Sequence, residues 1–255
     1  MSSEAAPLLT LIHPGWSAPA NIRAVCTTRA GGVSQPPWAS LNLGGHVGDE
    51  LGHVRKNRMI LADACGLQPG AFGWLSQVHG TNVADLSVGD ITGIPEADAS
   101  FTRAIGRACV ILTADCLPVI LCDRNGTTVA SAHAGWRSLC SGVLENLVAS
   151  MGLPGNTLMA WLGPAIGPKA FEVGPEVRAA FIAQDPQATT AFSPLGVREG
   201  HYMADIYSLA RLRLEALGVE NISGGDFCTV ADSHRFYSYR RDGQTGRMAT
   251  VIWKT

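Results

Sequence analysis

Short apolar runs separated by glycine, proline or polar turns recur along the 255-residue chain. Runs of this length, rich in branched residues and bounded by turn residues, are typical of buried strands. Residues 1–20 lack such a pattern, and we expect them to form a loose lead-in. Strands are expected over 22–28, 72–78, 84–88, 108–113, 118–122, 127–132, 158–162 and 248–253.

Apolar positions at helical spacing lie between several of these runs. Asp49 can cap a helix that continues to Cys65, and Gly66 can end it. A second amphipathic stretch follows Gly135 and continues to about Ser150. Further helices are expected over 175–184 and 205–217. Strands interleaved with helices predict a mixed α/β fold, and we expect one domain over 1–255, with mixed β-sheets and helices outside them.

Charge and composition narrow the class of protein. A net charge of −2 argues against nucleic acid as the main partner, because phosphate contacts need clustered basic residues. No apolar run approaches the roughly 18–20 residues that a membrane helix needs, and the amino terminus has no signal-peptide pattern. We therefore expect a cytoplasmic protein, either a monomer or a homodimer. Seven cysteines, an odd number, argue against a disulfide framework.

One thiol and two imidazoles stand at predicted strand ends. Cys116 and His133 are 17 positions apart and are joined by a predicted tight hairpin, which brings the ends of its two strands together. His79 follows a third strand. Two imidazoles and one thiolate leave a fourth zinc position for water or substrate, as in catalytic zinc sites. The same donors also bind copper, and no CxxC or HExxH spacing supports the assignment.

Each candidate also has a structural explanation. A histidine at a strand end often makes only hydrogen bonds, and Cys116 alone can be a buried thiol. Asp98 and Asp115 are candidates for proton transfer, but carboxylates in loops also cap turns. Arginines in glycine-rich loops can bind phosphate, or can be solvated surface charges; they are Arg29, Arg137, Arg240, Arg241 and Arg247. The remaining histidines are expected at the surface or in loops: His13, His46, His53, His201 and His234.

Eleven segments in order resemble one known family, that of the bacterial YfiH/YlmD proteins and human laccase domain-containing protein 1. Its members are labelled either polyphenol oxidases (laccases) or purine nucleoside phosphorylases. The sequence departs from the family at Ser138, where glycine is commoner. The matching segments are TRAGGVS (28–34), SLNLG (40–44), VGD (47–49), NR (57–58), QVHG (77–80), ADA (97–99), TADCLPV (113–119), AHAGWR (132–137), GPAIG (163–167), FYSYRRD (236–242) and TGR (245–247).

The resemblance implies a zinc site at His79, Cys116 and His133. It implies phosphorolysis of adenosine, inosine, guanosine and methylthioadenosine, and deamination of adenosine. It also implies a layered sandwich similar to the catalytic domain of cytotoxic necrotizing factor. The partners are then purine nucleosides and phosphate, with Arg29, Asn42, Gln77, Arg240 and Arg241 as the residues that bind substrate or phosphate.

Three other functions stay open on the residues alone. Cys116 and His133 can form a nucleophile–base pair in a metal-free hydrolase or amidase, for example one that edits peptidoglycan precursors, and that pair does not need His79. A zinc-stabilised binding protein would show metal-dependent folding without turnover. A copper-dependent polyphenol oxidase fits poorly, because a multicopper site needs many histidine ligands and the chain has seven histidines.

Overall fold

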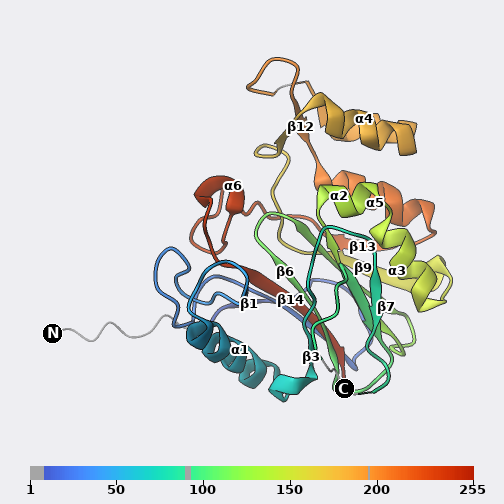
Figure 1. Cartoon of the computed structure of the whole chain (residues 1–255). Helices are drawn as coiled ribbons and strands as arrows, with labels where there is room; N and C mark the ends of the chain where they lie inside the picture. Colours follow the sequence, from blue (N-terminus) through green and yellow to red (C-terminus); the bar gives the residue numbers. More distant parts are fainter. Residues whose placement is uncertain (1–8, 90–92, 195) are drawn as a thin grey trace.

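Two large β-sheets lie against each other in the computed structural model, which describes residues 9–89, 93–194 and 196–255 (Figure 1). The first sheet has the strand order β1 (Leu11–Ile12), β2 (Ile22–Thr27), β14 (Met248–Lys254), β6 (Ala108–Thr113) and β3 (Phe72–Gly73). The second has the order β13 (Asn221–Gly224), β9 (Leu158–Leu162), β7 (Leu117–Asp123), β8 (Val129–Ala134), β5 (Ala99–Thr102) and β4 (Val83–Asp85).

A third, small sheet and the helices cover the outer faces and one end. The small sheet is β10 (Glu172–Val173), β12 (Tyr202–Ala204) and β11 (Phe192–Ser193), which lies with α4 at one end of the molecule (Figure 1). Short 3₁₀ turns lie at Pro69–Ala71, Gly155–Thr157 and Pro186–Ala191. The helices are α1 (Leu51–Cys65), α2 (Trp136–Cys140), α3 (Val143–Met151), α4 (Pro175–Gln184), α5 (Ile206–Ala216) and α6 (Tyr239–Asp242).

Strand periodicity explains the layers. In β7, Val119 and Leu121 pack in the cluster that contains α2, α3 and α5, whereas Ile120 and Cys122 pack in the cluster between the two large sheets. The outer face of the first sheet is covered by α1 through Leu61. Alternate residues of a strand point to opposite faces, so a fully apolar strand such as β7 must be buried on both. The result is a helix–sheet–sheet–helix sandwich, which confirms the predicted mixed α/β layers.

The chain changes sheets between β6 and β7. These consecutive strands belong to different sheets, and the link between them contains Asp115 and Cys116. Strand β7 then pairs antiparallel with β8, with Pro118 opposite His133. Cys116 therefore lies beside His133, as the 17-residue spacing predicted. Strands were expected over 108–113 and 118–122, but their placement in different sheets was not predicted.

Several predicted boundaries were wrong. The single helix expected after Gly135 is broken into α2 and α3 at Gly142, whose φ of 96° is outside the helical region. The strand expected over 72–78 forms a ladder only at Phe72–Gly73, followed by an isolated bridge between Ser76 and Glu96. The loose lead-in contributes strand β1, because Leu11 and Ile12 pair with β2; residues 1–8 of that segment lie outside the described residues. Within the described part of the chain, no helix is long and apolar enough to cross a membrane.

Candidate metal centre

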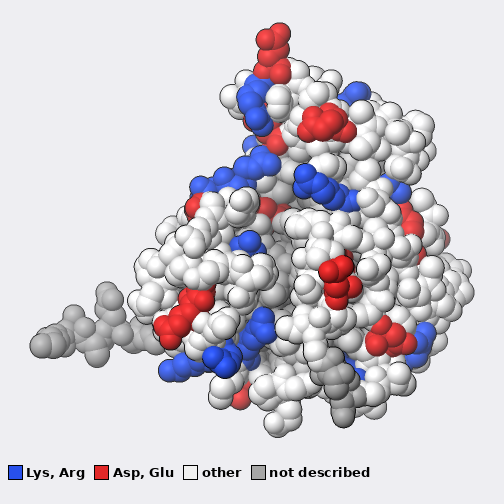
Figure 2. Space-filling model, viewed as in Figure 1, with Lys and Arg blue, Asp and Glu red and all other residues white. Residues whose placement is uncertain are grey.

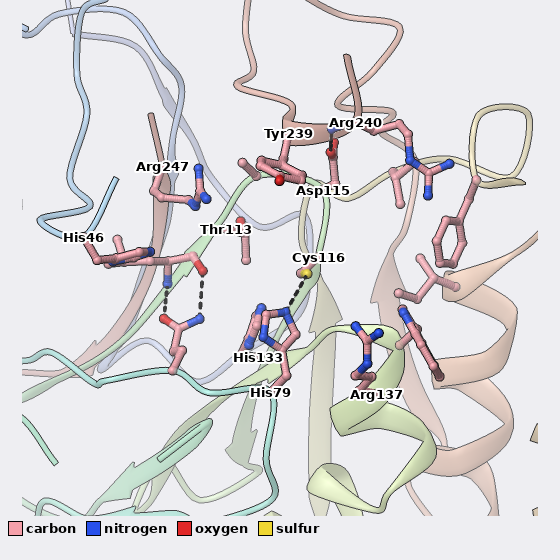
Figure 3. Close-up of a pocket in the computed structure, with 17 residues that line it drawn as sticks. His46, His79, Thr113, Asp115, Cys116, His133, Arg137, Tyr239, Arg240 and Arg247 are labelled. Atoms are coloured by element: carbon pink, nitrogen blue, oxygen red, sulfur yellow. Dashed lines mark hydrogen bonds between the residues drawn. The ribbon is translucent and has the colours of Figure 1, made fainter. Parts of the chain in front are cut away.

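His79, Cys116 and His133 converge from three separate segments. Their ligand atoms all lie within 4.8 Å of one another, and Cys116 Sγ is 3.7 Å from His79 Nε2. A tetrahedral zinc ion with Zn–S of ~2.3 Å and Zn–N of ~2.0–2.1 Å separates sulfur from nitrogen by about 3.6 Å. The observed spacing therefore fits a metal bound by these three side chains. Figure 3 shows them pointing toward one another.

A buried carboxylate fixes both histidines. Asp98 accepts hydrogen bonds from the backbone N–H groups of Val78, His79 and Gly80, at 3.1, 3.0 and 2.6 Å. Its Oδ1 also lies 2.8 Å from Nδ1 of His133. Nδ1 of His133 is thereby occupied, which leaves Nε2 as the ligand atom, and histidine ligands of metals commonly have such a carboxylate partner. His79 has a φ of 61°, and the carboxylate holds the backbone in this sparsely populated conformation.

Cys116 and His133 each stabilise the ionised form of the other. Burial opposes ionisation of Cys116, but the charge and hydrogen bonds of His133 and His79 outweigh it and lower its pKa to about 6. Burial also disfavours the charged form of His133, yet Cys116 and Asp98 raise its pKa to about 9. In contrast, burial raises the pKa of Cys26 and Cys109 to about 12. Cys116 is thus prepared to act as a thiolate, the form that binds metals.

Asp115 anchors the loop that carries Cys116. It also has a left-handed backbone, with φ of 95°. One carboxylate oxygen accepts the Thr229 hydroxyl and the other accepts the Arg240 N–H, both at 2.6 Å. The carboxylate therefore ties the loop between β6 and β7 to two distant segments of the chain.

A cavity of about 420 Å³ opens over the three ligand residues. Its volume is in the range of small-molecule sites. Arg137, Arg240 and Arg247 line it, and Asp115 is its one acidic lining residue among those described. Figure 2 shows a hollow in this face of the molecule with basic side chains along its rim. The cavity therefore favours an anionic molecule bound beside His79, Cys116 and His133.

The five predicted substrate-binding residues are not all in this cavity. Gln77 and Arg240 line it, whereas Arg29, Asn42 and Arg241 do not. Both ends of the Gln77 amide are already paired with the backbone of Leu112. Arg29 bonds to the carbonyls of residues 39 and 233, and Arg241 bonds to the Asp242 carboxylate and to carbonyls of residues 229, 230 and 236. These contacts give Arg29 and Arg241 a structural role.

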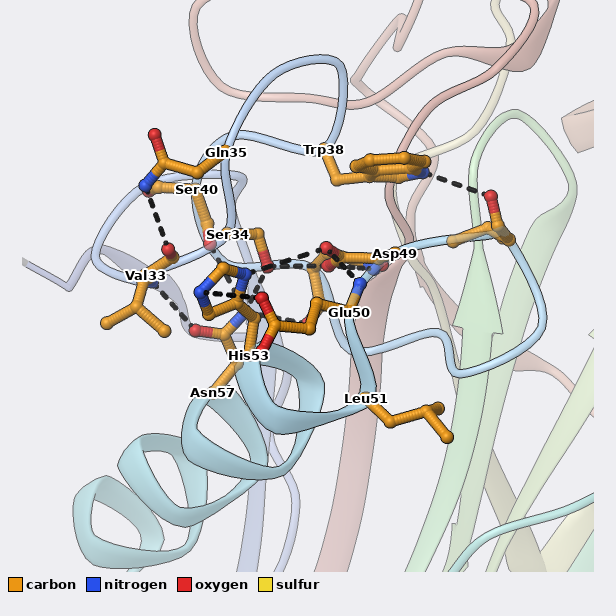
Figure 4. Close-up of polar contacts among 12 residues, drawn as sticks. Val33, Ser34, Gln35, Trp38, Ser40, Asp49, Glu50, Leu51, His53 and Asn57 are labelled. Carbon is orange, nitrogen blue, oxygen red and sulfur yellow. Dashed lines mark hydrogen bonds and ion pairs between the residues drawn. The ribbon is translucent and has the colours of Figure 1, made fainter.

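Asn42 belongs to a buried polar network at the start of α1. Figure 4 shows Ser34, Asp49 and Asn57 of this network. Asp49 accepts hydrogen bonds from Asn42, Ser34 and the N–H of Glu50, so it orders the loop, whereas the N-cap of α1 is Glu50 and not Asp49 as expected. The side chain of Asn42 also accepts the backbone N–H of Arg247 at 2.9 Å. The network therefore fixes one wall of the cavity.

His46 and Thr113 were missed as functional candidates, and Arg247 was not distinguished from the other loop arginines that can bind phosphate. His46 was expected to be a surface or loop residue, and it is exposed but lines the cavity. Arg247 was noted only as one of several loop arginines, and Thr113 was not singled out. Their segments are far apart in sequence, so no local pattern joins them. The only available signal was that all three lie in or beside segments shared with the family.

Comparisons with known proteins agree with this architecture. The family model described as "multi-copper polyphenol oxidoreductase laccase" matches residues 23–255, and the chain belongs to this family. Over 95% of its length the chain is 54% identical to a purine nucleoside phosphorylase of Pseudomonas aeruginosa, covering 97% of that protein. It is 53% identical, again over 95% of its length, to the purine nucleoside phosphorylase YfiH of Escherichia coli, covering 98% of it.

Solved structures show the same fold. A Neisseria meningitidis protein superposes with a TM-score of 0.90 at 49% identity, covering 96% of this chain and 98% of that one. YlmD from Geobacillus stearothermophilus superposes with a TM-score of 0.84 at 30% identity, covering 97% of this chain and 99% of that one. The YfiH/YlmD resemblance predicted from the sequence is thereby confirmed.

Proposed function

We propose that this protein is a zinc-dependent purine nucleoside phosphorylase. The observation that carries the proposal is that a His–Cys–His ligand group and three arginines line one cavity of about 420 Å³. Relatives more than 50% identical along nearly the whole chain are named purine nucleoside phosphorylases. A phosphorylase must hold an anion and a nucleoside side by side, and this cavity combines basic and apolar walls.

His79, Cys116 and His133 would hold the zinc ion. Bound there, the metal supplies a positive charge and a Lewis acid beside the substrate. Asp98 keeps His133 oriented through Nδ1, and its bonds to residues 78–80 keep His79 in place. Three protein ligands would leave a fourth coordination position for water or substrate, as in catalytic rather than structural zinc sites.

The reaction is phosphorolysis of adenosine, inosine, guanosine or methylthioadenosine. A phosphate oxygen forms a bond to C1′ of the ribose while the bond from C1′ to the purine nitrogen breaks, and the departing purine takes up a proton. Arginine side chains hold the phosphate and place it for attack. Trp136, Ile166 and Phe171 supply an apolar wall for the base. Deamination of adenosine, in which water replaces the amino group at C6 and ammonia leaves, belongs to the same proposal.

A second candidate function is supported by the Cys116–His133–Asp98 arrangement. A thiol with a lowered pKa, an imidazole and a buried carboxylate are the parts of a cysteine hydrolase. Such an enzyme would form a thioester or related adduct at Cys116 and would not need His79. The family description also names copper oxidation, but the described residues contain one three-ligand group, and a multicopper centre requires more.

The test compares wild type with His79→Ala and with His53→Ala, a matched change at a histidine outside the cavity. Metal content is measured by elemental analysis, and base release from adenosine is followed with and without phosphate. The proposal expects one zinc per chain, phosphate-dependent release of adenine, and loss of both only in His79→Ala. A metal-free protein that is active without phosphate and tolerates His79→Ala would establish the hydrolase instead.

A further inference from the structure

We propose that Arg247, Thr113 and His46 form the subsite that binds inorganic phosphate. This inference deepens the proposed function and rests on it for the identity of the anion. Figure 3 shows His46 and Arg247 on one side of Cys116, and Arg137 and Arg240 on the other. His79, Cys116 and His133 thus divide the cavity into two ends. The subsite differs from the set expected from the sequence, in which Arg240 was the only residue that both carries a charge and lines the cavity.

Arg247 is a partly buried cation without a direct ion-pair partner among the described residues, and the charges of Cys116 and Asp115 offset the effect of its burial only in part. Its side chain is half-buried, and Nη1 donates to the carbonyl oxygens of Thr245 and Gly246 at 3.0 Å each. No described carboxylate forms an ion pair with it. Burial lowers the pKa of Arg247, which is the cost of keeping this cation away from water. Because buried charges are normally paired, an anion from solution is the missing partner.

Thr113 supplies an independent indication of a ligand. The residue is 2% exposed, and its hydroxyl has no hydrogen-bond partner within the described part of the chain. It nevertheless lines the cavity at the end of β6, and Met248, the residue after Arg247, is its partner in β14. Buried hydroxyl groups are almost always paired in folded proteins. A phosphate oxygen beside Arg247 would accept a hydrogen bond from the Thr113 hydroxyl.

His46 adds an uncharged donor to the subsite. Its pKa is held below the ordinary value by partial burial and by the charges of Arg247, Arg58 and His133. A neutral imidazole retains one N–H donor that can serve an anion. The loop that carries His46 is fixed to the same wall, since Asn42 bonds to the Gly44 N–H and to the Arg247 N–H. The wall is therefore ordered before a ligand arrives.

The opposite end of the cavity suits the nucleoside better. Arg240 there already donates to the Glu172 carbonyl at 3.1 Å, and the guanidinium of Arg137 lies 4.5 Å from the Trp136 ring centre. Three of the apolar lining residues, Ile166, Phe171 and Ile206, come from segments near this end. A purine base needs such apolar contacts, whereas inorganic phosphate does not. Phosphate and base then approach the ribose from the two sides of the ligand group.

The experiment measures phosphate binding apart from turnover. Thermal unfolding of the metal-loaded protein is followed over a range of inorganic phosphate concentrations, since a ligand of the folded state raises Tm with concentration. Phosphate is expected to raise the Tm of wild type and of Arg240→Gln, and to have no effect on Arg247→Gln. Thr113→Val should fold at least as stably as wild type, because it removes an unpaired buried hydroxyl, yet bind phosphate ~10-fold more weakly. Thr250→Val, the same exchange in the interior of β14 and outside the cavity, should bind phosphate like wild type.

Steady-state kinetics with adenosine provides the second measurement. Thr113→Val should raise the KM for phosphate ~10-fold while the KM for adenosine stays the same. The subsite is overturned if Thr113→Val and Arg247→Gln both keep the wild-type response to phosphate, or if Arg240→Gln alone removes it. If phosphate raises Tm only when Arg247 is present but the protein catalyses no phosphorolysis, the proposed function is rejected. The cavity would then still be a site that binds an oxyanion.

Discussion

Two hydrogen bonds join Asp98 and His133. The backbone N–H of His133 donates to the Asp98 carbonyl at 2.7 Å, and its Nδ1 lies 2.8 Å from the Asp98 carboxylate. The same carboxylate accepts three N–H groups around His79. Burial alone would raise its pKa, but the bonds from His133 and Gly80 lower the pKa of Asp98 below its ordinary value. It is fully buried and does not line the cavity, so we expect it to position both histidines and not to carry a proton to substrate.

We predict that Asp98→Asn weakens metal binding 10–100-fold, the usual effect of losing the carboxylate behind a histidine ligand. The amide nitrogen also faces backbone donors, which costs about 1–3 kcal/mol of unfolding free energy. Metal affinity is measured by competition with a chelator, and stability by denaturant unfolding of the apoprotein. Asp123→Asn is the matched control, because Asp123 is equally buried and accepts the N–H groups of Thr127 and Thr128 far from the site. It should lose stability and keep its metal affinity.

The thiol of Cys116 is predicted to react selectively once the metal has been removed. Alkylation by iodoacetamide follows the thiolate fraction, so its rate should be half-maximal near pH 6 instead of near pH 9. Cys65 is the internal control, because burial raises its pKa to about 11. Peptide mapping after a short reaction at pH 7 should find the label at Cys116, and metal reloading should prevent it. A midpoint near 9 would contradict the mutual ionisation of Cys116 and His133.

Cys116 and His133 together should leave the unfolding free energy of the apoprotein almost independent of pH. A Cys116 pKa lowered from 9.0 to about 6 stabilises the folded apoprotein as pH rises from 6 to 9, because the unfolded chain still holds that proton. A His133 pKa raised from 6.5 to about 9 has the opposite slope from 6.5 to 9. The two slopes cancel, so we expect the pair to change the unfolding free energy by less than about 1 kcal/mol between pH 6.5 and 9. Denaturant unfolding at several pH values, compared with a Cys116→Ala/His133→Gln double variant, measures this contribution.

Local pattern predicted the fold better than it predicted the site. The ranges 158–162 and 175–184 agree with the observed β9 and α4, because their apolar periodicity and flanking turn residues are local signals. The contact of Cys116 with His133 was also predictable, since one hairpin joins them. The position of His79 was not, because it depends on Asp98 and on a left-handed backbone. The shared place of His46 and Arg247 in one wall of the cavity was not predictable for the same reason: the bond from Arg247 to Asn42 spans 205 positions.

Glycine at position 135 leaves space for the ligand cluster. A methyl group there would lie 3.0 Å from Cδ2 of His79 and 3.1 Å from Sγ of Cys116. Its φ of −58° suits any residue, so backbone strain plays no part in the effect. We predict that Gly135→Ala lowers metal affinity at least ~10-fold, through displacement of the thiolate or of His79, with little change in the stability of the apoprotein. Gly70→Ala, where the added carbon meets nothing within 4 Å, is the control and should bind metal normally.

The variant Asp115→Asn separates two possible roles of Asp115, an anchor for the loop and a proton carrier. Both of its oxygens accept short hydrogen bonds, from the Thr229 hydroxyl and the Arg240 N–H, although it lines the cavity. Asn tolerates the left-handed backbone and keeps one acceptor, so Asp115→Asn should cost about 1–3 kcal/mol of stability for the other bond. If Asp115 only anchors the loop, kcat measured below the lowered Tm falls less than ~10-fold and the pH profile keeps its shape. A proton carrier would instead lose 100-fold or more in kcat and one limb of the profile. We expect the first result, because both oxygens already make short bonds that hold the loop to Thr229 and Arg240.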